Sequence, residues 1–413
     1  MQRFERNIKL FYVFNFFIGL LFSIPIWVAF EHRILTFGQM ALFSAISTAI
    51  ETFLQIPTGA IADMMGRKSA LIIGWMTLAV LYLFEAYAKT PLQFFLIFAF
   101  AGAATSLSSG ADVALVYDSL QAMKKEGMFS LVVAKAKFWY RISMAAATLI
   151  GGYLFLTNIS FPYVGQAIAF LIGIILLFLM YEPTVSIKRS ISITMYIRHM
   201  HQGFTELFKN SYMVKLTIFY SLIGAITWSC LNYYNLTFMS DIGFSTKELA
   251  VFFALAYIIS AFVIYFLAKL PITLTREHIY LGFPLLMSLS LLPGVFANHV
   301  IAPLMLIVTQ ITGGARFTLL DRYANQEFSS RYRATANSAL NMLVSICYIV
   351  LVTLGGQFQD TYGTKIIYTM LGVLTVLFVL PSSITLLISH RKGLSQMIAV
   401  KTAIVEENEQ KEI

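Results

Sequence analysis

Apolar stretches of about 20 residues recur along the whole chain, and they constrain its fold more than any other feature. Each stretch is long enough to cross, as a helix, a hydrocarbon core roughly 30 Å thick. Only 12% of the 413 residues are charged, about half the usual share, so these residues cannot build a water-exposed surface. The sequence therefore predicts an all-α membrane protein whose helices satisfy their own backbone hydrogen bonds.

Twelve such spans can be counted, in two sets of six on either side of a more polar segment. Their expected limits are 8–30, 36–61, 70–88, 92–118, 137–157, 160–181, 212–238, 248–269, 278–297, 301–323, 334–357 and 365–388. The expected domains are a six-helix bundle over 1–181, a cytoplasmic linker over 182–211, a second six-helix bundle over 212–389 and a cytoplasmic tail over 390–413. The first stretch is too long for a signal peptide, so we expect it to be retained.

The basic residues orient this layout in the membrane. With both termini in the cytoplasm, 23 Lys and Arg residues fall on the cytoplasmic side and 4 on the outer side, an asymmetry that sets orientation. The net charge of +9 therefore reflects residues that flank spans, and we expect no nucleic-acid partner. Within the linker, Ile193, Ile197, Met200, Phe204 and Leu207 form an apolar stripe. This stripe predicts an amphipathic helix on the inner membrane surface, with a disordered linker as the alternative.

The two halves share short matches at one offset of 204 residues. "SGAD" at 109–112 corresponds to "GGAR" at 313–316, and "LIGGYLF" at 149–155 corresponds to "TLGGQFQ" at 353–359. A common offset indicates a duplicated six-helix unit, and such parallel repeats place the substrate site between the halves. Asp112 and Arg316 then occupy equivalent positions in the two halves.

The segment "GAIADMMGRKSAL", Gly59 to Leu71, lies in the cytoplasmic turn between spans two and three. It resembles the loop signature of the major facilitator superfamily, and the twelve spans extend this resemblance over nearly the whole chain. Gly66 permits a sharp reversal, and Gly59 is expected to allow close approach of a neighbouring helix. The resemblance implies a gate on the cytoplasmic side. In that gate Asp63 would face the start of span eleven near Arg333, and Arg67 would pair with Asp118.

Three further segments, "PTG" at 57–59, "YDSL" at 117–120 and "RATANS" at 333–338, are similar to a bacterial branch rich in drug-efflux members. That branch often has a glutamate directly before its "x-P-T-G", whereas this chain has Gln55 there and Glu51 one turn earlier. The resemblance implies a transporter of the bacterial inner membrane that moves its substrate outward. It leaves the role of the missing acid open.

Four charged residues, Glu51, Asp112, Arg141 and Arg316, lie at least four residues from either end of their spans. Glu51 is roughly 15 Å deep by helical rise, and a carboxyl group away from water can take up a proton near neutral pH. We expect Glu51, together with Asp112, to carry the coupling proton, with a permanently protonated structural Glu51 as the alternative. Asp112 and Arg141 can form either a fixed ion pair or a switch. Arg141 and Arg316 are candidates for binding an anionic group.

Span seven carries a polar and aromatic stretch that includes Trp228, Asn232 and Tyr233. Aromatic faces with a few amides suit an amphipathic or cationic substrate, although interfacial belt residues are the rival interpretation for the tyrosines. Glu85, near the outer end of span three, is expected to reach the interface. No metal site, nucleotide-binding loop or catalytic set is recognisable, so we expect neither an enzyme nor a cofactor.

The leading hypothesis is a secondary active transporter, a proton-coupled exporter of a small amphipathic drug-like compound or metabolite, which acts as a monomer by alternating access. A second hypothesis is a proton-coupled transporter of an organic anion bound by Arg141 and Arg316. A third is a membrane sensor that transports nothing.

Overall fold

The computed structural model describes residues 2–182, 193–269, 276–316, 320–329 and 332–392. These residues form helices and short connections, and none of them belongs to a strand. The all-α membrane architecture expected from the apolar stretches is therefore confirmed.

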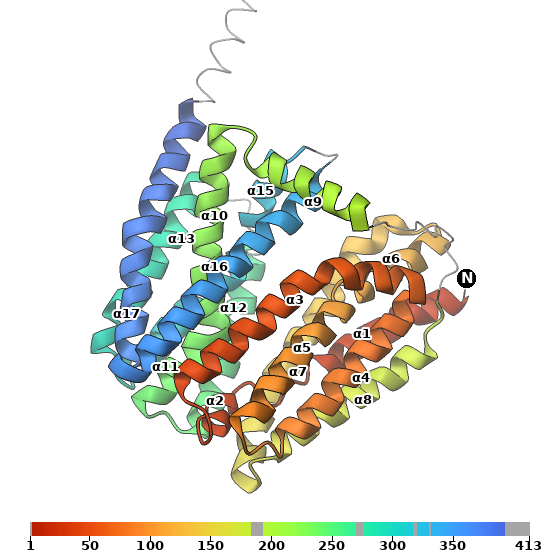
Figure 1. Cartoon of the computed structure of the whole chain (residues 1–413), viewed down its shortest axis with the longest axis horizontal. Helices are drawn as coiled ribbons and strands as arrows, with labels where there is room; N and C mark the ends of the chain where they lie inside the picture. The colour runs from red at the N-terminus through yellow and green to blue at the C-terminus, as the bar shows by residue number, and fades with distance from the viewer. Residues whose placement is uncertain (1, 183–192, 270–275, 317–319, 330–331, 393–413) are drawn as a thin grey trace, which may run out of the picture.

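The helices fall into two halves joined by one helix (Figure 1). The N-terminal half contains α1 (Gln2–Ile18), α2 (Trp27–Glu31), α3 (Phe37–Met65), α4 (Arg67–Glu85), α5 (Pro91–Ser108), α6 (Ala111–Ala122), η1 (Glu126–Met128), α7 (Phe129–Thr157) and α8 (Phe161–Leu179). The joining helix is α9 (Ile193–Leu207). The C-terminal half contains α10 (Ser211–Ser229), η2 (Cys230–Tyr234), α11 (Asn235–Ile242), α12 (Thr246–Lys269), α13 (Arg276–Leu291), η3 (Leu292–Phe296), α14 (Ile301–Ala315), α15 (Asp321–Glu327), α16 (Arg333–Tyr362), α17 (Thr364–Leu374) and η5 (Thr375–Val379).

Among the described residues, nine helical segments are long and apolar enough to cross a membrane. Three other helices, α1, α7 and α14, lie in the same bundles but are shorter or carry more charge. With these three, the helices correspond to the twelve expected spans.

The first span is not the continuous helix expected over 8–30. Its helix α1 ends at Ile18, residues 19–26 are irregular, and α2 adds only five residues. Gln166 of α8 compensates for part of the break, because its Oε1 accepts hydrogen bonds from the backbone N–H and the hydroxyl of Ser23 at 3.1 and 2.8 Å. Irregular backbone at membrane depth is tolerated only where protein or a cavity covers it. This break therefore marks the interior of the bundle.

Two other spans are also interrupted. Span four breaks between α5 and α6 at Gly110, which has a φ of +77°. Span seven contains the π-helical turn η2, a distortion that often occurs at functional sites. The irregular turns thus change the direction of side chains in the middle of the membrane, where a substrate would pass.

The molecule has two ends along the direction of the helices. We call the end with the start of α1, the connection from α3 to α4 and the helix α9 the terminal face, and the end with α2, α11 and the connection from α4 to α5 the far face (Figure 1). The halves meet mainly through α3 against α16 and α7 against α12. These are long helices that run from one face to the other.

Contacts between the halves are closest near the far face. The backbone N–H of Gly38 donates to Asp360 Oδ2 at 2.9 Å, and the Tyr233 hydroxyl donates to the carbonyl of Phe37 at 2.6 Å. Gly356 leaves no room for a side chain against Ala41. One cluster of buried apolar residues also runs from the C-terminal half into the far-face part of the N-terminal half. The far face is therefore closed by a packed core.

Toward the terminal face the halves are separated by a cavity of about 270 Å³. Residues of both halves and of α9 line it, among them Thr52, Gln55, Met200, Trp228 and Asn341. This region has no counterpart of the continuous apolar cluster seen at the far face among the described residues. The structure is therefore closed at the far face and looser at the terminal face.

The linker helix α9 packs on protein. Its stripe residues Met200 and Phe204 lie against the apolar core, Leu207 is fully buried, and Gly203 approaches the carbonyl of Thr335 on α16. The side chains of the stripe residues Ile193 and Ile197 lie outside the described set, as do residues 183–192 and most of the expected tail. The described part of the amphipathic helix thus faces α16.

Glu206 anchors α9 to the C-terminal half. Its carboxylate accepts hydrogen bonds from Lys209 Nζ at 2.7 Å and from the backbone N–H of Ser329 at 2.8 Å. Burial alone would raise the pKa of Glu206, but these hydrogen bonds lower it below its ordinary value. The anchor therefore stabilises the fold at neutral pH and is lost as the pH falls through this lowered pKa.

The turn between spans two and three is tighter than expected. Helix α3 continues to Met65 and α4 begins at Arg67, so Gly66 alone connects them. Gly66 has a φ of +94° and a ψ of +139°, a combination that is open to glycine only. A side chain here would also meet the carboxylate of Glu182 at 2.8 Å. The predicted sharp reversal at Gly66 is confirmed.

Replacing Gly66 by Ala is expected to lower the free energy of unfolding by roughly 1–3 kcal/mol, because alanine must adopt a strained backbone conformation. Thermal unfolding of the purified protein in detergent measures this loss. The matched control is Gly127→Ala, because a β-carbon at Gly127 would meet no atom within 4 Å and its φ is ordinary. Equal unfolding temperatures for the two variants would contradict this account of the turn.

Candidate functional site

A cavity of about 420 Å³ lies between the two halves. The N-terminal half contributes the broken part of span one and the middle of α7, and the C-terminal half contributes η2, α12 and α14. Its aromatic lining consists of Trp27, Tyr140, Phe253 and Tyr257. We call it the central cavity.

The charged residues that line the central cavity are both cationic, Lys137 and Arg141. They stand one turn apart on α7, which places them on the same side of the helix. Neither forms an ion pair with another described residue, although Lys137 Nζ lies 5.6 Å from the centre of the Tyr140 ring and the Arg141 side chain is exposed to the cavity. The cavity therefore offers positive charge at Arg141 and Lys137, and Asp112 of α6 offsets part of the charge of Lys137 from outside the cavity lining.

The C-terminal half supplies neutral polar groups to the same cavity. Gln310 on α14 is 5% exposed, and its Nε2 has no hydrogen-bond partner among the described residues. Asn232 on η2 donates to the carbonyl of Trp228 at 3.0 Å and lines the cavity with Ser260. A substrate in the cavity could thus contact a cation from one half and an amide donor from the other.

Lys137 and Gln310 were not expected from the sequence. The span with Lys137 was placed at 137–157, which left this lysine at the membrane boundary. Helix α7 begins at Phe129, so Lys137 lies two turns inside it. The sequence did contain a signal for this lining. Tyr140 and Arg141 follow Lys137 by three and four residues, which places all three on one side of a helix.

The predicted coupling residue Glu51 lies on α3, where this helix faces α16 of the other half. Its charge acts on Tyr348 of α16, whose hydroxyl is 3.0 Å from the Ser44 hydroxyl. Glu51 is half-buried. It therefore faces the interface between the halves, as a coupling role requires, and this role stays a prediction.

The structure does not bring together Asp112, Arg141 and Arg316. Asp112 stands in the first turn of α6 and makes no ion pair with Arg141, and the cation that acts on it is Lys137. Arg316 directly follows α14, is 2% exposed and points toward α10, with its guanidinium 5.5 Å from the Tyr220 ring. It lies inside the C-terminal half, where packing on α10 keeps it away from the central cavity. Joint anion binding by Arg141 and Arg316 is thus not present in this structure.

The predicted polar and aromatic stretch of span seven divides between cavities. Trp228 stacks on Tyr348, with ring centroids 5.1 Å apart, and lines the cavity near the terminal face. Asn232 lines the central cavity, and Tyr233 reaches across to α3 at the far-face closure. These residues lie between the halves, and their substrate-binding role stays a prediction.

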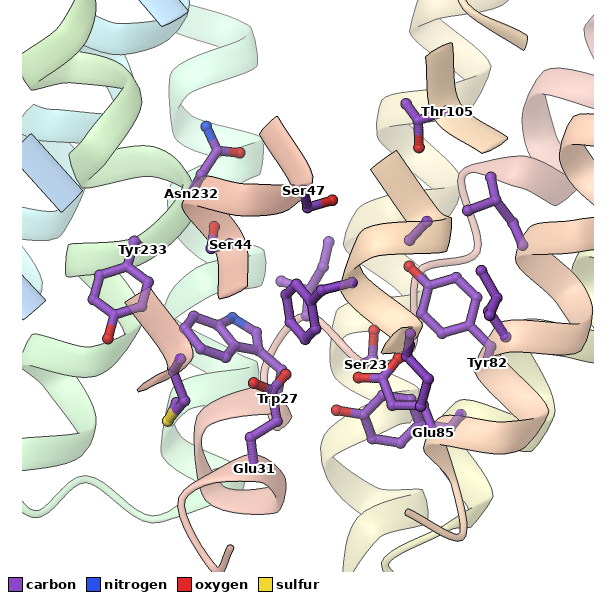
Figure 2. Close-up of a pocket in the computed structure, with 18 residues that line it drawn as sticks. Ser23, Trp27, Glu31, Ser44, Ser47, Tyr82, Glu85, Thr105, Asn232 and Tyr233 are labelled. Carbon is purple, nitrogen blue, oxygen red and sulfur yellow. The ribbon is translucent and has the colours of Figure 1, made fainter. Parts of the chain in front are cut away.

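A second cavity, of about 310 Å³, lies beside the central one near the far face (Figure 2). The two share Ile24, Trp27 and Asn232 in their linings. We call it the acidic cavity, because two carboxylic acids line it, Glu31 of α2 and Glu85 of α4. Glu85 is only 7% exposed, so the expectation that it reaches the interface is wrong. The end of α4 faces α2 and α8 and is covered by them.

The turn at Gly66 carries the expected ion pair. Arg67 Nη1 lies 2.5 Å from Asp118 Oδ2, with both residues in the N-terminal half. The adjacent Lys68 donates from Nζ to the carbonyls of Phe178 and Met180 at the end of α8. These contacts tie α4, α6 and α8 together at the terminal face.

The predicted gate also includes Gly59 and Asp63. The expectation that Gly59 permits close helix approach is wrong, because Gly59 is exposed and a β-carbon there would meet no atom within 4 Å. The halves are apart at this end, so none of the helices that the structure describes packs on Gly59. The side chain of Asp63 lies outside the described set. The gating role of this segment therefore stays a prediction.

The sequence matches the family model of the Major Facilitator Superfamily over residues 9–346. The chain belongs to this superfamily. It is therefore a multi-pass membrane protein and a secondary transporter, not an enzyme. Membership does not specify the drug-efflux branch, the substrate or the coupling ion.

Two curated relatives of this transporter are themselves uncharacterised. It is 22% identical over 384 residues to the MFS-type transporter YxaM of Bacillus subtilis, which covers 88% of this chain and 92% of the relative. It is 32% identical over 145 residues to the MFS-type transporter MJ1317 of Methanocaldococcus jannaschii. That second match spans about a third of each chain (34%).

Solved structures show the same fold. The nucleoside transporter NupG matches with a TM-score of 0.73 and 15% identity, over 94% of this chain and 99% of NupG. A bacterial homologue of the human lysosomal transporter Spinster, in an inward-facing and unoccupied conformation, matches with a TM-score of 0.70 and 14% identity, over 94% of this chain and 96% of that one. At these identities the likeness establishes the fold alone.

Removing the pair of Arg67 and Asp118 in a double-mutant cycle is expected to reveal a coupling free energy of about 1 kcal/mol, since both side chains are partly shielded from water. Unfolding of the Arg67→Ala, Asp118→Ala and double variants in detergent measures it. The control pair is Lys125 and Glu5, 3.2 Å apart and more exposed, for which the coupling should be smaller. A coupling of zero for Arg67 and Asp118 would contradict a structural role for their ion pair.

Proposed function

We propose that this secondary transporter carries a small organic anion with a planar or aromatic part, bound in the central cavity. The observation that supports this most directly is the charge of the lining, where Lys137 and Arg141 occur without a carboxylate. A charge-assisted hydrogen bond to Arg141 would favour a carboxylate or a similar acidic group. The aromatic rings around it suit the rest of the molecule.

Binding between the halves fits an alternating mechanism. Arg141 belongs to the N-terminal half, whereas Gln310 and Tyr257 belong to the C-terminal half. A substrate that contacts both halves binds with one affinity when the halves are close together around the cavity and with another when they are further apart. Only such a difference in affinity allows a ligand to shift the equilibrium between the two shapes.

The cavity charge argues against the cationic drug-like substrates included in the leading hypothesis. A cation at Lys137 and Arg141 would meet like charge, which costs free energy. Neutral amphipathic compounds remain compatible with the aromatic lining. No observation favours a membrane sensor that transports nothing.

Orientation and coupling complete the proposal. The excess of basic residues supports an orientation with the terminal face in the cytoplasm, and in that orientation this structure is the shape that is closed to the outside. The bacterial inner membrane is an expectation from the resemblance. Glu51, at the interface of α3 and α16, is the predicted proton carrier, and Asp112 beside Lys137 is the predicted second one. Outward transport and a monomeric state remain expectations from the resemblance.

The charge preference can be tested with benzoate and benzamidinium, two planar probes of similar size and opposite charge. Benzoate is expected to raise the unfolding temperature of the purified transporter, because a ligand that binds only the folded state stabilises it. Arg141→Gln should weaken this effect roughly tenfold or more in apparent affinity, since it removes a charged hydrogen-bond donor. Lys137→Gln should weaken it as well.

The matched control is Lys135→Gln. Lys135 is also on α7, but its ammonium lies over the Tyr12 ring at 5.1 Å and does not line the cavity. This variant should bind benzoate as the unaltered transporter does. Stabilisation by benzamidinium alone, by neither probe, or by benzoate equally well in Arg141→Gln would each refute the proposal.

A further inference from the structure

The acidic cavity places two buried carboxylic acids close together. Glu31 is 2% exposed and ends α2, and Glu85 is 7% exposed and ends α4. In Figure 2 both carboxyl groups point into the space between these helices. The two carboxyl groups lie close enough to each other for the charge of Glu85 to act on Glu31.

Neither acid has a compensating cation in the described structure. No described Lys, Arg or His forms an ion pair with Glu31 or Glu85. Arg33, two residues after Glu31, instead stacks on the Phe30 ring at 4.3 Å and donates to the Phe30 carbonyl at 2.8 Å. Two neighbouring buried carboxylates cannot both stay ionised without such a partner.

The other groups around the pair are mostly neutral. The titratable and charged residues that face it from the surrounding elements are His32, Arg33, Tyr82, Tyr163, Tyr233 and Asp360. His32 is turned toward the carbonyl of Leu35, and Asp360 accepts the hydrogen bond of Gly38. The tyrosines therefore supply hydroxyl groups, not charge, to the two acids.

One buried carboxyl oxygen at this site, Glu31 Oε2, has no hydrogen-bond partner among the described residues, on a side chain that is 2% exposed. An unpaired polar atom is costly in an interior. A carboxylate oxygen only accepts hydrogen bonds, so a proton on one acid supplies a donor that the two carboxyl groups otherwise lack.

The position equivalent to Glu31 in the other half shows which kind of side chain the packing there accepts. At the offset of 204 residues, Glu31 corresponds to Asn235. The Asn235 Oδ1 accepts hydrogen bonds from Tyr368 at 2.8 Å and from Thr309 at 3.3 Å. A neutral amide fills the equivalent position, so an ionisable side chain is not required by the architecture.

We propose that Glu31 and Glu85 form a proton-binding site, which holds one exchangeable proton shared between the two carboxyl groups while the far face is closed. The site is next to that closure, because Trp27 packs on Tyr233, whose hydroxyl bonds across the halves to Phe37. When the far face opens, water can reach the pair and both acids can ionise. Closing the far face then takes up one proton.

The use of this proton for coupling rests on the proposed anion transport, but the binding of the proton does not. The acidic cavity shares the wall of Trp27 and Asn232 with the central cavity. A proton at the pair is therefore a neighbour of an anion bound near Arg141. This juxtaposition gives each ligand a way to influence the other.

The test is a proton-binding titration of the purified transporter in detergent without any anion, from about pH 5 to pH 9, the range in which buried glutamates titrate. The Glu31→Gln/Glu85→Gln double variant is expected to bind one proton fewer than the unaltered protein. A second readout is the fluorescence of Trp27 in a protein whose other three tryptophans are replaced by Phe. Its pH-dependent change should disappear in the double variant.

The matched control is Glu126→Gln, which removes an exposed carboxylate of η1 outside the acidic cavity and should leave proton binding by the pair unchanged. If the double variant does not fold, the single Glu31→Gln change should move the remaining step to lower pH, because Glu85 loses its like-charged neighbour. Identical proton binding and Trp27 fluorescence in all variants would overturn the proposal. If benzoate does not bind but the proton-binding step is intact, only the proposed anion transport is refuted.

Discussion

The fold depends on one constraint, that backbone hydrogen bonds inside a membrane must be satisfied by the protein itself. Long helices such as α3 and α16 meet it directly. Where span one becomes irregular over 19–26, the side chain of Gln166 takes up the hydrogen bonds of Ser23. Such breaks are possible only in the interior, so they place Trp27 and Glu31 where the cavities form.

The sequence predicted the architecture well because apolar length, basic flanks and the Gly66 turn are local signals. It predicted the ion pair of Arg67 and Asp118 through a family motif. It did not predict the cavity lining, because this depends on helix ends and rotation. Lys137 was assigned to a loop since a boundary was placed eight residues too late, relative to the observed start at Phe129. Glu85 was assigned to the interface because the cover provided by α2 and α8 is a tertiary effect.

The two halves share a plan but differ in chemistry. The N-terminal half carries the cations of α7 and the acids Glu31 and Glu85. The C-terminal half presents the neutral amide of Gln310 to the central cavity, and Asn235 stands where Glu31 stands in the other half. The basic side chains and the carboxylic acids of the two cavities thus belong to the N-terminal half, and the C-terminal half provides neutral contacts. In this account substrate and proton binding alter the balance between shapes, and packing at the far face stabilises the present one.

The most direct test of this account is a pair of distance measurements between spin labels on the two halves, with both native cysteines removed. One pair joins Met64 to Gln326 at the terminal face, and the other joins Lys89 to Val300 at the far face, all four being exposed. Across changes in pH and added benzoate, the account predicts that one distance shortens whenever the other lengthens. Distances that change together, or never change, would contradict alternating access by the two halves.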